Sequence, residues 1–316
     1  MKKFILSAAI LATLASCNYN NTIATNYEAI QFGNNFVENA VRADYSTTHI
    51  TEFNVYGTVD GGQGDVLIFD EARVYSNNQD GSQYNQIWNC DVTQYWISGA
   101  KYVFTALVDV PENDVTRVNG KLPASFTYTA ISQNDVLAHT VGMVGKEAGN
   151  NSTVAFTFTH LLAKAYFTLT SGTPDANYTY SISNVKLTNA YANGVYTLPT
   201  YAWTDATFNK VTEGAWAGSI PSDYEFVAIE NVANGTPKKN AEVLLIPGAT
   251  VGVSFDVTLK IDGTEITTYN FSKANVATLA ANTVYNFNVL LQSQDQINFT
   301  VTEQPKWATP DNTVDL

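Results

Sequence analysis

The sequence has few of the residues that nucleic-acid-binding proteins and most metal or catalytic sites depend on. Its 316 residues include three histidines, two cysteines and two methionines, and 16 basic residues stand against 29 acidic ones, for a net charge of −13. Binding to a phosphate backbone needs clustered lysines and arginines. Beyond the N-terminus the only adjacent basic pair is Lys238-Lys239, inside a turn-like segment. The composition therefore predicts no nucleic-acid partner.

The histidines and cysteines also lack the spacing of known catalytic or metal sites. His49, His139 and His160 belong to no HExxH motif, and no CxxC, GxSxG or glycine-rich phosphate loop occurs. Cys90 is interpreted as a small buried hydrophobic residue. A glycosidase-like pair of carboxylates would require the fold to bring two acidic side chains together. We predict a protein that is not an enzyme, with no catalytic residue, metal or cofactor.

Long apolar runs are absent apart from one at the N-terminus. Residues 4–15 form an apolar segment too short to span a bilayer, and Lys2 and Lys3 precede it. The segment ends in Leu14-Ala15-Ser16-Cys17, which resembles the lipobox of bacterial lipoproteins. In those proteins the cysteine thiol carries a diacylglyceryl group. We predict a signal peptide over residues 1–16 and a lipid on Cys17; the alternative is an ordinary cleaved signal peptide with a cysteine nearby.

Alternation of apolar and polar residues is the dominant pattern in the rest of the chain. Its longest run covers Val251 to Ile261 and stops at Asp262-Gly263, a typical hairpin dipeptide. Similar runs cover residues 102–108, 154–159 and 285–291, and only Ala274 to Ala281 looks weakly helical. Many short antiparallel strands favour sandwiches over a parallel sheet. The pattern predicts an all-β protein, and the length favours two domains. We place their division near residue 160, after the polar Gly- and Asn-rich loop from Lys146 to Ser152 and the strand that follows it.

The last strand-like segment is unusual because it lies near a free C-terminus. Ile297, Phe299 and Val301 alternate with Asn298, Thr300 and Thr302, and a tail with Pro305, Trp307 and Pro310 follows. An apolar alternating strand needs a pairing partner. We therefore expect another strand to pair with this segment, and one candidate is the C-terminal sheet of the same chain.

Several short segments, in this order, resemble the fimbrillin family of Bacteroidetes, the lipoprotein pilins of type V pili. Beside the lipobox at Cys17, they are Ile30-Gln31-Phe32, Val41-Arg42-Ala43, Phe53-Asn54-Val55-Tyr56-Gly57, Gln94-Tyr95-Trp96, Tyr102-Val103-Phe104, Phe158-Thr159-His160-Leu161-Leu162-Ala163-Lys164, Leu245-Ile246-Pro247-Gly248, Leu279-Ala280-Ala281-Asn282-Thr283-Val284-Tyr285 and the stretch from Ile297 to Trp307.

The resemblance implies two tandem transthyretin-like Greek-key β-sandwich domains. After the signal peptide (1–16), residues 17–42 would be a lipid-anchored tether with a removable first strand. Residues 43–160 would form the N-terminal sandwich, and residues 161–316 the C-terminal sandwich with the candidate donor strand. The expected location is the outer membrane, through the lipid anchor, and the surface fimbria.

Assembly in this family implies roles for particular residues. A trypsin-like protease would cut between Arg42 and Ala43, and the first strand, with Ile30 and Phe32, would leave its groove. A strand of another subunit would take its place. The candidate donor residues are Ile297, Phe299 and Val301. The expected partners are other fimbrillin subunits, the processing protease and the outer membrane, and the expected function is a structural role in adhesive fimbriae.

Two other classes of function remain open on the sequence alone. One is a monomeric surface lipoprotein that binds glycans through exposed aromatic side chains, with Trp88, Trp96, Trp203 and Trp216 as candidates. The other is a lipoprotein hydrolase with convergent acidic residues in a pocket. Core positions are the default for aromatic residues in strands.

Overall fold

The computed structural model describes residues 27–33, 36–37, 50–76, 88–172, 177–233, 235–293 and 296–305. Within these ranges the elements are β-strands and three short 3₁₀ turns, η2 (Glu112–Asp114), η3 (Val118–Gly120) and η4 (Ala130–Ser132). The prediction of an all-β protein is therefore confirmed. The same residues include no helix with the length and apolarity that a membrane span requires.

The N-terminal half is built on a sheet whose described strands follow the order β1-β9-β8-β5-β2-β3-β4. Their bounds are β1 (Phe36–Val37), β2 (Glu52–Asp60), β3 (Asp65–Ser76), β4 (Trp88–Cys90), β5 (Lys101–Val108), β8 (Leu137–Val144) and β9 (Thr157–His160). Central strand β5 carries Tyr102, Phe104 and Ala106 on one face, and all three are fully buried. Thr105 and Leu107 on its other face are 2% exposed, so both faces of this strand are covered.

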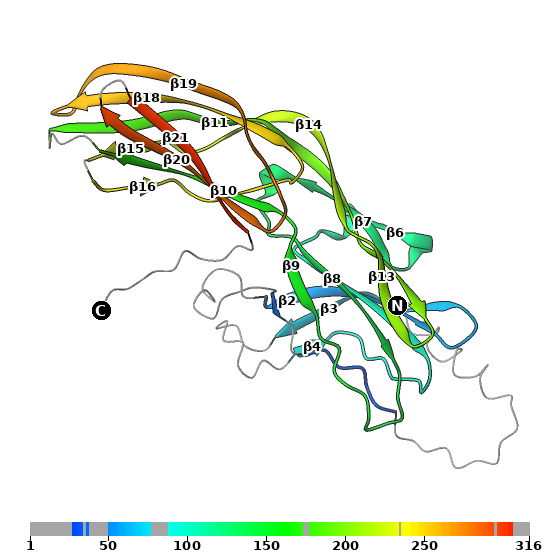
Figure 1. Cartoon of the computed structure of the whole chain (residues 1–316). Helices are drawn as coiled ribbons and strands as arrows, with labels where there is room; N and C mark the ends of the chain where they lie inside the picture. Colours follow the sequence, from blue (N-terminus) through cyan, green and yellow to red (C-terminus); the bar gives the residue numbers. More distant parts are fainter. Residues whose placement is uncertain are drawn as a thin grey trace, which may run out of the picture.

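The C-terminal half is a sandwich of two sheets (Figure 1). One sheet holds β10 (Ala163–Ser171), β16 (Lys238–Lys239), β17 (Val243–Leu245), β20 (Thr283–Ser293) and β21 (Gln296–Pro305). The other holds β6 (Val115–Arg117), β7 (Pro123–Thr129), β11 (Tyr178–Thr197), β14 (Ala215–Glu225), β15 (Ile229–Val232), β18 (Thr250–Ile261) and β19 (Thr264–Thr278). In the described part of the chain, β21 and β19 are edge strands.

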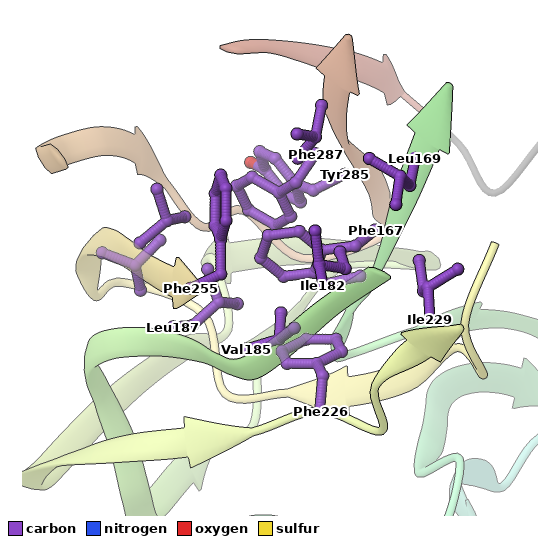
Figure 2. Close-up of a cluster of buried hydrophobic side chains, with 14 of the residues drawn as sticks. Phe167, Leu169, Ile182, Val185, Leu187, Phe226, Ile229, Phe255, Tyr285 and Phe287 are labelled. Atoms are coloured by element: carbon purple, nitrogen blue, oxygen red, sulfur yellow. The ribbon is translucent and has the colours of Figure 1, made fainter. Parts of the chain in front are cut away.

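Aromatic and branched side chains fill the space between these two sheets. Figure 2 shows Phe167 of β10 and Phe287 of β20 beside Phe255 of β18. The rings of Phe167 and Phe287 stack with centroids 5.0 Å apart, and all three side chains are at most 1% exposed. At ~1.5–3 kcal/mol for each large buried side chain, this core is a main source of stability for the C-terminal half.

The longest predicted alternation agrees with the structure, and the predicted helical segment is wrong. Strands β18 and β19 form a hairpin at Asp262-Gly263, where both residues have positive φ, as a type I′ turn requires. The segment from Ala274 continues strand β19 to Thr278 instead of forming a helix. Residues 274–276 form a bulge in the ladder, because Lys273 pairs with Val253 and Ala277 with Val251. Pairing with β18 overrides the weak local helical preference.

The two halves share structure across the predicted boundary. Strand β7 precedes residue 160, yet it pairs with Asn193–Thr197 of β11. One hydrophobic cluster draws on residues 30–158 and another on residues 163–291, while a third, which includes Tyr56, Phe126 and Ile246, joins both halves. The division into residues 43–160 and 161–316 stays a prediction.

A hairpin of the C-terminal half also covers the N-terminal sheet. It consists of β12 (Thr200–Thr204) and β13 (Thr207–Thr212). The ring of Phe208 lies over Gly142 of β8 so closely that a Cβ on this glycine would meet the ring at 2.3 Å. The ring of Phe208 also stacks on that of Tyr201, 5.0 Å away between centroids. The missing side chain at Gly142 is what lets the hairpin rest on the sheet.

A charged cluster joins β3 to the η2–β6 segment. Arg117 forms ion pairs with Asp70 and with Glu71, the latter at 3.6 Å between Nη2 and Oε2. Burial and a hydrogen bond with Glu112 raise the pKa of Glu71 to about 7. Close to neutral pH this carboxyl group therefore titrates in the folded protein.

Candidate functional site

The segment Tyr27–Gly33 lies between two parts of the N-terminal half. On one side the amide of Ile30 donates to the Gln94 carbonyl (2.8 Å), and the Trp96 amide donates to that of Glu28 (2.9 Å). On the other side the Gly33 amide donates to the Val154 carbonyl and the Val154 amide to that of Gln31, at 3.0 and 2.7 Å. The pairings are two isolated bridges, Ala29 with Tyr95 and Phe32 with Val154. The segment is thus held as a strand-like insert without a continuous ladder.

The apolar side chains of this segment complete the N-terminal core. Ile30 and Phe32 are each 5% exposed. The Phe32 ring stacks on Phe156, with centroids 6.1 Å apart, and meets three further rings edge-on. Those three rings belong to Phe53 of β2, Phe69 of β3 and Phe104 of β5. Withdrawal of the segment would leave an apolar groove lined by these four phenylalanines.

The polar side of the segment faces outward. Gln31 is exposed between the buried Ile30 and Phe32, as alternation in an extended segment requires. An opening of about 540 Å³ lies beside the segment, between it and edge strand β4. Cys90 of β4 lines this opening, and burial raises the pKa of its thiol. A raised pKa makes the thiol a poor nucleophile at neutral pH.

The predicted donor residues lie in the C-terminal sandwich. Ile297, Phe299 and Val301 belong to β21, which pairs antiparallel with β20 along its length, from Gln296 to Pro305. All three are partly buried against the C-terminal core, while Asn298 and Thr300 are exposed. The Phe299 ring lies 5.5–6.3 Å from the rings of Phe255, Phe271 and Phe287. In this structure β21 is therefore an edge strand of its own sandwich.

Some predicted site residues are not placed by the structure. Cys17, Arg42 and Ala43 lie outside the described residues. Among the described residues, no cluster of three or more histidine, cysteine or acidic side chains has the arrangement of a metal site.

The aromatic residues considered for glycan binding take part in packing. Trp96 is 6% exposed, and Trp216 donates from Nε1 to the Leu161 carbonyl at 2.6 Å. Trp203 lies against Phe208, with Lys101 5.5 Å from its ring centre. Trp88 lies against Phe53.

His160 is also buried, and its Nδ1 is 2.9 Å from a carboxylate oxygen of Asp135.

One contact of the first segment was not predicted from the sequence. The Glu28 carboxylate accepts hydrogen bonds from the Gly149 amide (2.8 Å) and from Nδ2 of Asn151 (2.7 Å). Gly149 and Asn151 each lie more than 120 residues from Glu28 in the sequence. The sequence offers one indirect signal, the Gly-Asn-rich loop that ends at Asn151, since such loops expose main-chain donors.

Comparison with known proteins agrees with this architecture. The model of the fimbrillin-like family matches residues 41–305. The chain belongs to the fimbrillin-like family. No curated protein sequence matches it.

Solved structures share this fimbrillin-like fold at low sequence identity. A fimbrial protein of Bacteroides vulgatus superposes with a TM-score of 0.55 at 13% identity, over 87% of this chain and 98% of that one. Two proteins described in terms of cell adhesion are also similar. The one from Bacteroides ovatus has a TM-score of 0.51 at 14% identity, over 90% of this chain and 99% of that one. The one from Bacteroides uniformis has a TM-score of 0.50 at 16% identity, over 80% of this chain and 91% of that one.

Proposed function

We propose that this protein is a structural subunit of an adhesive surface fimbria and that it assembles by strand exchange. The observation that carries the proposal is the state of the first segment, Tyr27–Gly33. It buries Ile30 and Phe32 in the core, yet it pairs with its neighbours through two isolated bridges and not through a ladder. A segment with large buried side chains and few main-chain bonds is suited to replacement, because a longer strand would gain hydrogen bonds in the same groove.

A repeated tripeptide suggests the register of the incoming strand. Isoleucine, an amide residue and phenylalanine follow one another twice in the sequence, at Ile30-Gln31-Phe32 and at Ile297-Asn298-Phe299. An acidic residue stands two positions before each, Glu28 and Asp295. In this register Ile297 of a second copy takes the position of Ile30, and Phe299 that of Phe32.

Exchange requires β21 to leave its own sheet. As an edge strand it pairs with one strand, β20, within the described residues, so its departure breaks one ladder. The groove offers compensation, because each large apolar side chain that fills it contributes ~1.5–3 kcal/mol. Strand addition also restores main-chain pairing in the acceptor.

Processing and anchoring complete the proposal. A trypsin-like protease cuts after Arg42 and so separates the first segment from the residues that follow Ala43. A lipid on Cys17 holds the precursor at the outer membrane. The partners are other fimbrillin subunits. Family membership and the similar fimbrial and cell-adhesion folds support this role and favour a protein without enzymatic activity.

A reversible lock on the first segment tests the mechanism. A Cβ on Gly33 would lie 3.6 Å from Cβ of Thr153, within the range of natural disulfides. The variant Gly33→Cys/Thr153→Cys is made in a Cys17→Ser/Cys90→Ser background, which removes both natural thiols. After trypsin, the oxidised variant should stay monomeric, and reductant should restore assembly.

The controls distinguish the effect of the disulfide from the effects of the substitutions themselves. Each single cysteine variant should assemble after trypsin whether oxidised or reduced. Arg42→Ala should stay monomeric in trypsin if Arg42 is the cleavage site that matters. Equal assembly of the oxidised and reduced double variant, with the disulfide confirmed by mass spectrometry, would show that the first segment need not leave its groove.

A further inference from the structure

We propose that the loop of residues 146–151 is a carboxylate receptor that holds the first segment through Glu28, so that this contact sets how readily the segment is released. The inference rests on the proposed strand exchange and assigns the regulation of that site. One Glu28 oxygen, Oε2, faces the Gly149 amide at 2.8 Å, the Asn151 amide at 3.4 Å and Asn151 Nδ2 at 2.7 Å. Two short charge-assisted bonds therefore join residues far apart in sequence.

The loop is organised to present these donors. The side-chain oxygen of Asn151 accepts from the Lys146 amide at 2.7 Å, and its Nδ2 lies 3.2 Å from the Lys146 carbonyl. The Asn150 amide donates to the Glu147 carbonyl (3.0 Å), and Gly149 has a φ of +84°. Asn151 thus bonds to its own loop through both ends of its side-chain amide, and Nδ2 makes its shortest hydrogen bond to Glu28.

Electrostatics agree with this arrangement. The hydrogen bond from Asn151 holds the pKa of Glu28 below its ordinary value, so the charged carboxylate is the bound form at neutral pH. The loop itself carries Lys146 and Glu147, both exposed. The main-chain and amide donors, rather than a net positive charge on the loop, account for recognition of the carboxylate.

The position of Glu28 gives the contact its regulatory role. Glu28 stands at the N-terminal end of the segment, and its carbonyl accepts from the Trp96 amide. The apolar anchors Ile30 and Phe32 follow it. Release that starts at this end must break the Glu28 contacts before Ile30 and Phe32 can leave the core. Loss of the carboxylate should therefore loosen the segment without removing any buried apolar group.

Hydrogen exchange in the full mature chain tests the receptor before any cleavage. Glu28→Ala should accelerate exchange of the Ile30 amide, which is bonded to Gln94, about tenfold. The Phe104 amide in β5 should exchange at the wild-type rate. Gln31→Ala, at an exposed position of the same segment, and Glu147→Gln, which removes an exposed carboxylate of the loop, should leave both rates unchanged. An unchanged Ile30 rate in Glu28→Ala overturns the proposal.

A swapped pair gives a second measurement that a general loss of loop structure would not reproduce. Asn151→Asp places two carboxylates face to face and should accelerate Ile30 exchange. Adding Glu28→Gln restores an amide–carboxylate pair and should return the rate toward wild type. Fast exchange in the double variant would show that Asn151 acts only on its own loop.

Assembly after trypsin separates this inference from the proposed function. Glu28→Ala should assemble faster than wild type because its segment leaves sooner. Faster exchange together with assembly that the Gly33–Thr153 lock does not block would leave the receptor standing and refute strand exchange. Wild-type exchange in Glu28→Ala together with a lock that does block assembly would refute the receptor alone.

Discussion

Replacing Phe299 by aspartate tests whether β21 is part of the folded monomer. Phe299 is partly buried, and its ring lies close to Phe255, Phe271 and Phe287. Its neighbour Thr300 is exposed on the same edge strand. Phe299→Asp and Thr300→Asp therefore add the same charge one position apart, on opposite faces of one strand.

The expected cost follows from the contacts. Truncating a fully buried phenylalanine costs about 3–5 kcal/mol, and the partial burial of Phe299 reduces this to about 2 kcal/mol. A half-buried carboxylate adds about 1 kcal/mol, since it is partly desolvated. Lys273, 5.9 Å from the ring centre, offsets less than about 1 kcal/mol of this. A net loss of about 2–3 kcal/mol corresponds to a fall in Tm of roughly 4–12 °C.

Thermal unfolding of the uncleaved monomer, followed by circular dichroism, measures both variants. Thr300→Asp should stay within about 0.5 kcal/mol of wild type. Equal falls in Tm would mean that the assigned faces of β21 are wrong. No fall for Phe299→Asp would mean that β21 contributes nothing to the monomer. Since Phe299→Asp weakens the monomer as well as any exchange, its effect on assembly is interpreted only below its Tm.

Three further predictions concern other parts of the molecule. Gly142→Ala should push the Phe208 ring off the N-terminal sheet, because a Cβ on this residue would meet the ring at 2.3 Å. Faster hydrogen exchange confined to β12 and β13 would show this displacement, whereas unchanged exchange in the hairpin would contradict the close contact. Glu71, hydrogen-bonded to Glu112, has a pKa of about 7 against 4.5 for the free group, so the folded state binds this proton more tightly. Protonated Glu71 contributes fully to the free energy of unfolding below about pH 4.5, and this contribution is lost as the pH rises through about 7. Urea unfolding should therefore show lower stability at about pH 8 than at about pH 5. Glu71→Gln should reduce that difference by about 1–2 kcal/mol. Cys17→Ser should release the protein from outer membranes in a high-salt wash, since serine forms no thioether; continued membrane association would contradict lipidation at this residue.

The class of fold and much of the local structure follow from the amino-acid sequence alone. Side chains alternate between the two faces of a strand, so the period-two runs identified strands without any knowledge of their partners. The Asp262-Gly263 dipeptide located the β18–β19 hairpin, because a type I′ turn needs positive φ at both of its central positions. Alternation also separated Phe299 from Thr300, and Ile30 and Phe32 from Gln31. These features depend on residues close together in the chain.

The contacts between distant segments, in contrast, become visible only in the folded chain. Three contacts join segments that lie far apart in the sequence. They are the pairing of β7 with β11, the packing of Phe208 over Gly142, and the hydrogen bonds from residues 146–151 to Glu28. No local pattern encodes such contacts, because they depend on how whole sheets pack against one another. Pairing with β18 likewise made Ala274 to Thr278 part of a strand against a weak helical tendency. Local propensities are worth tenths of a kcal/mol per residue, and the pairing of Lys273 and Ala277 with β18 on either side of the bulge, together with the burial of Ala277, outweighs them.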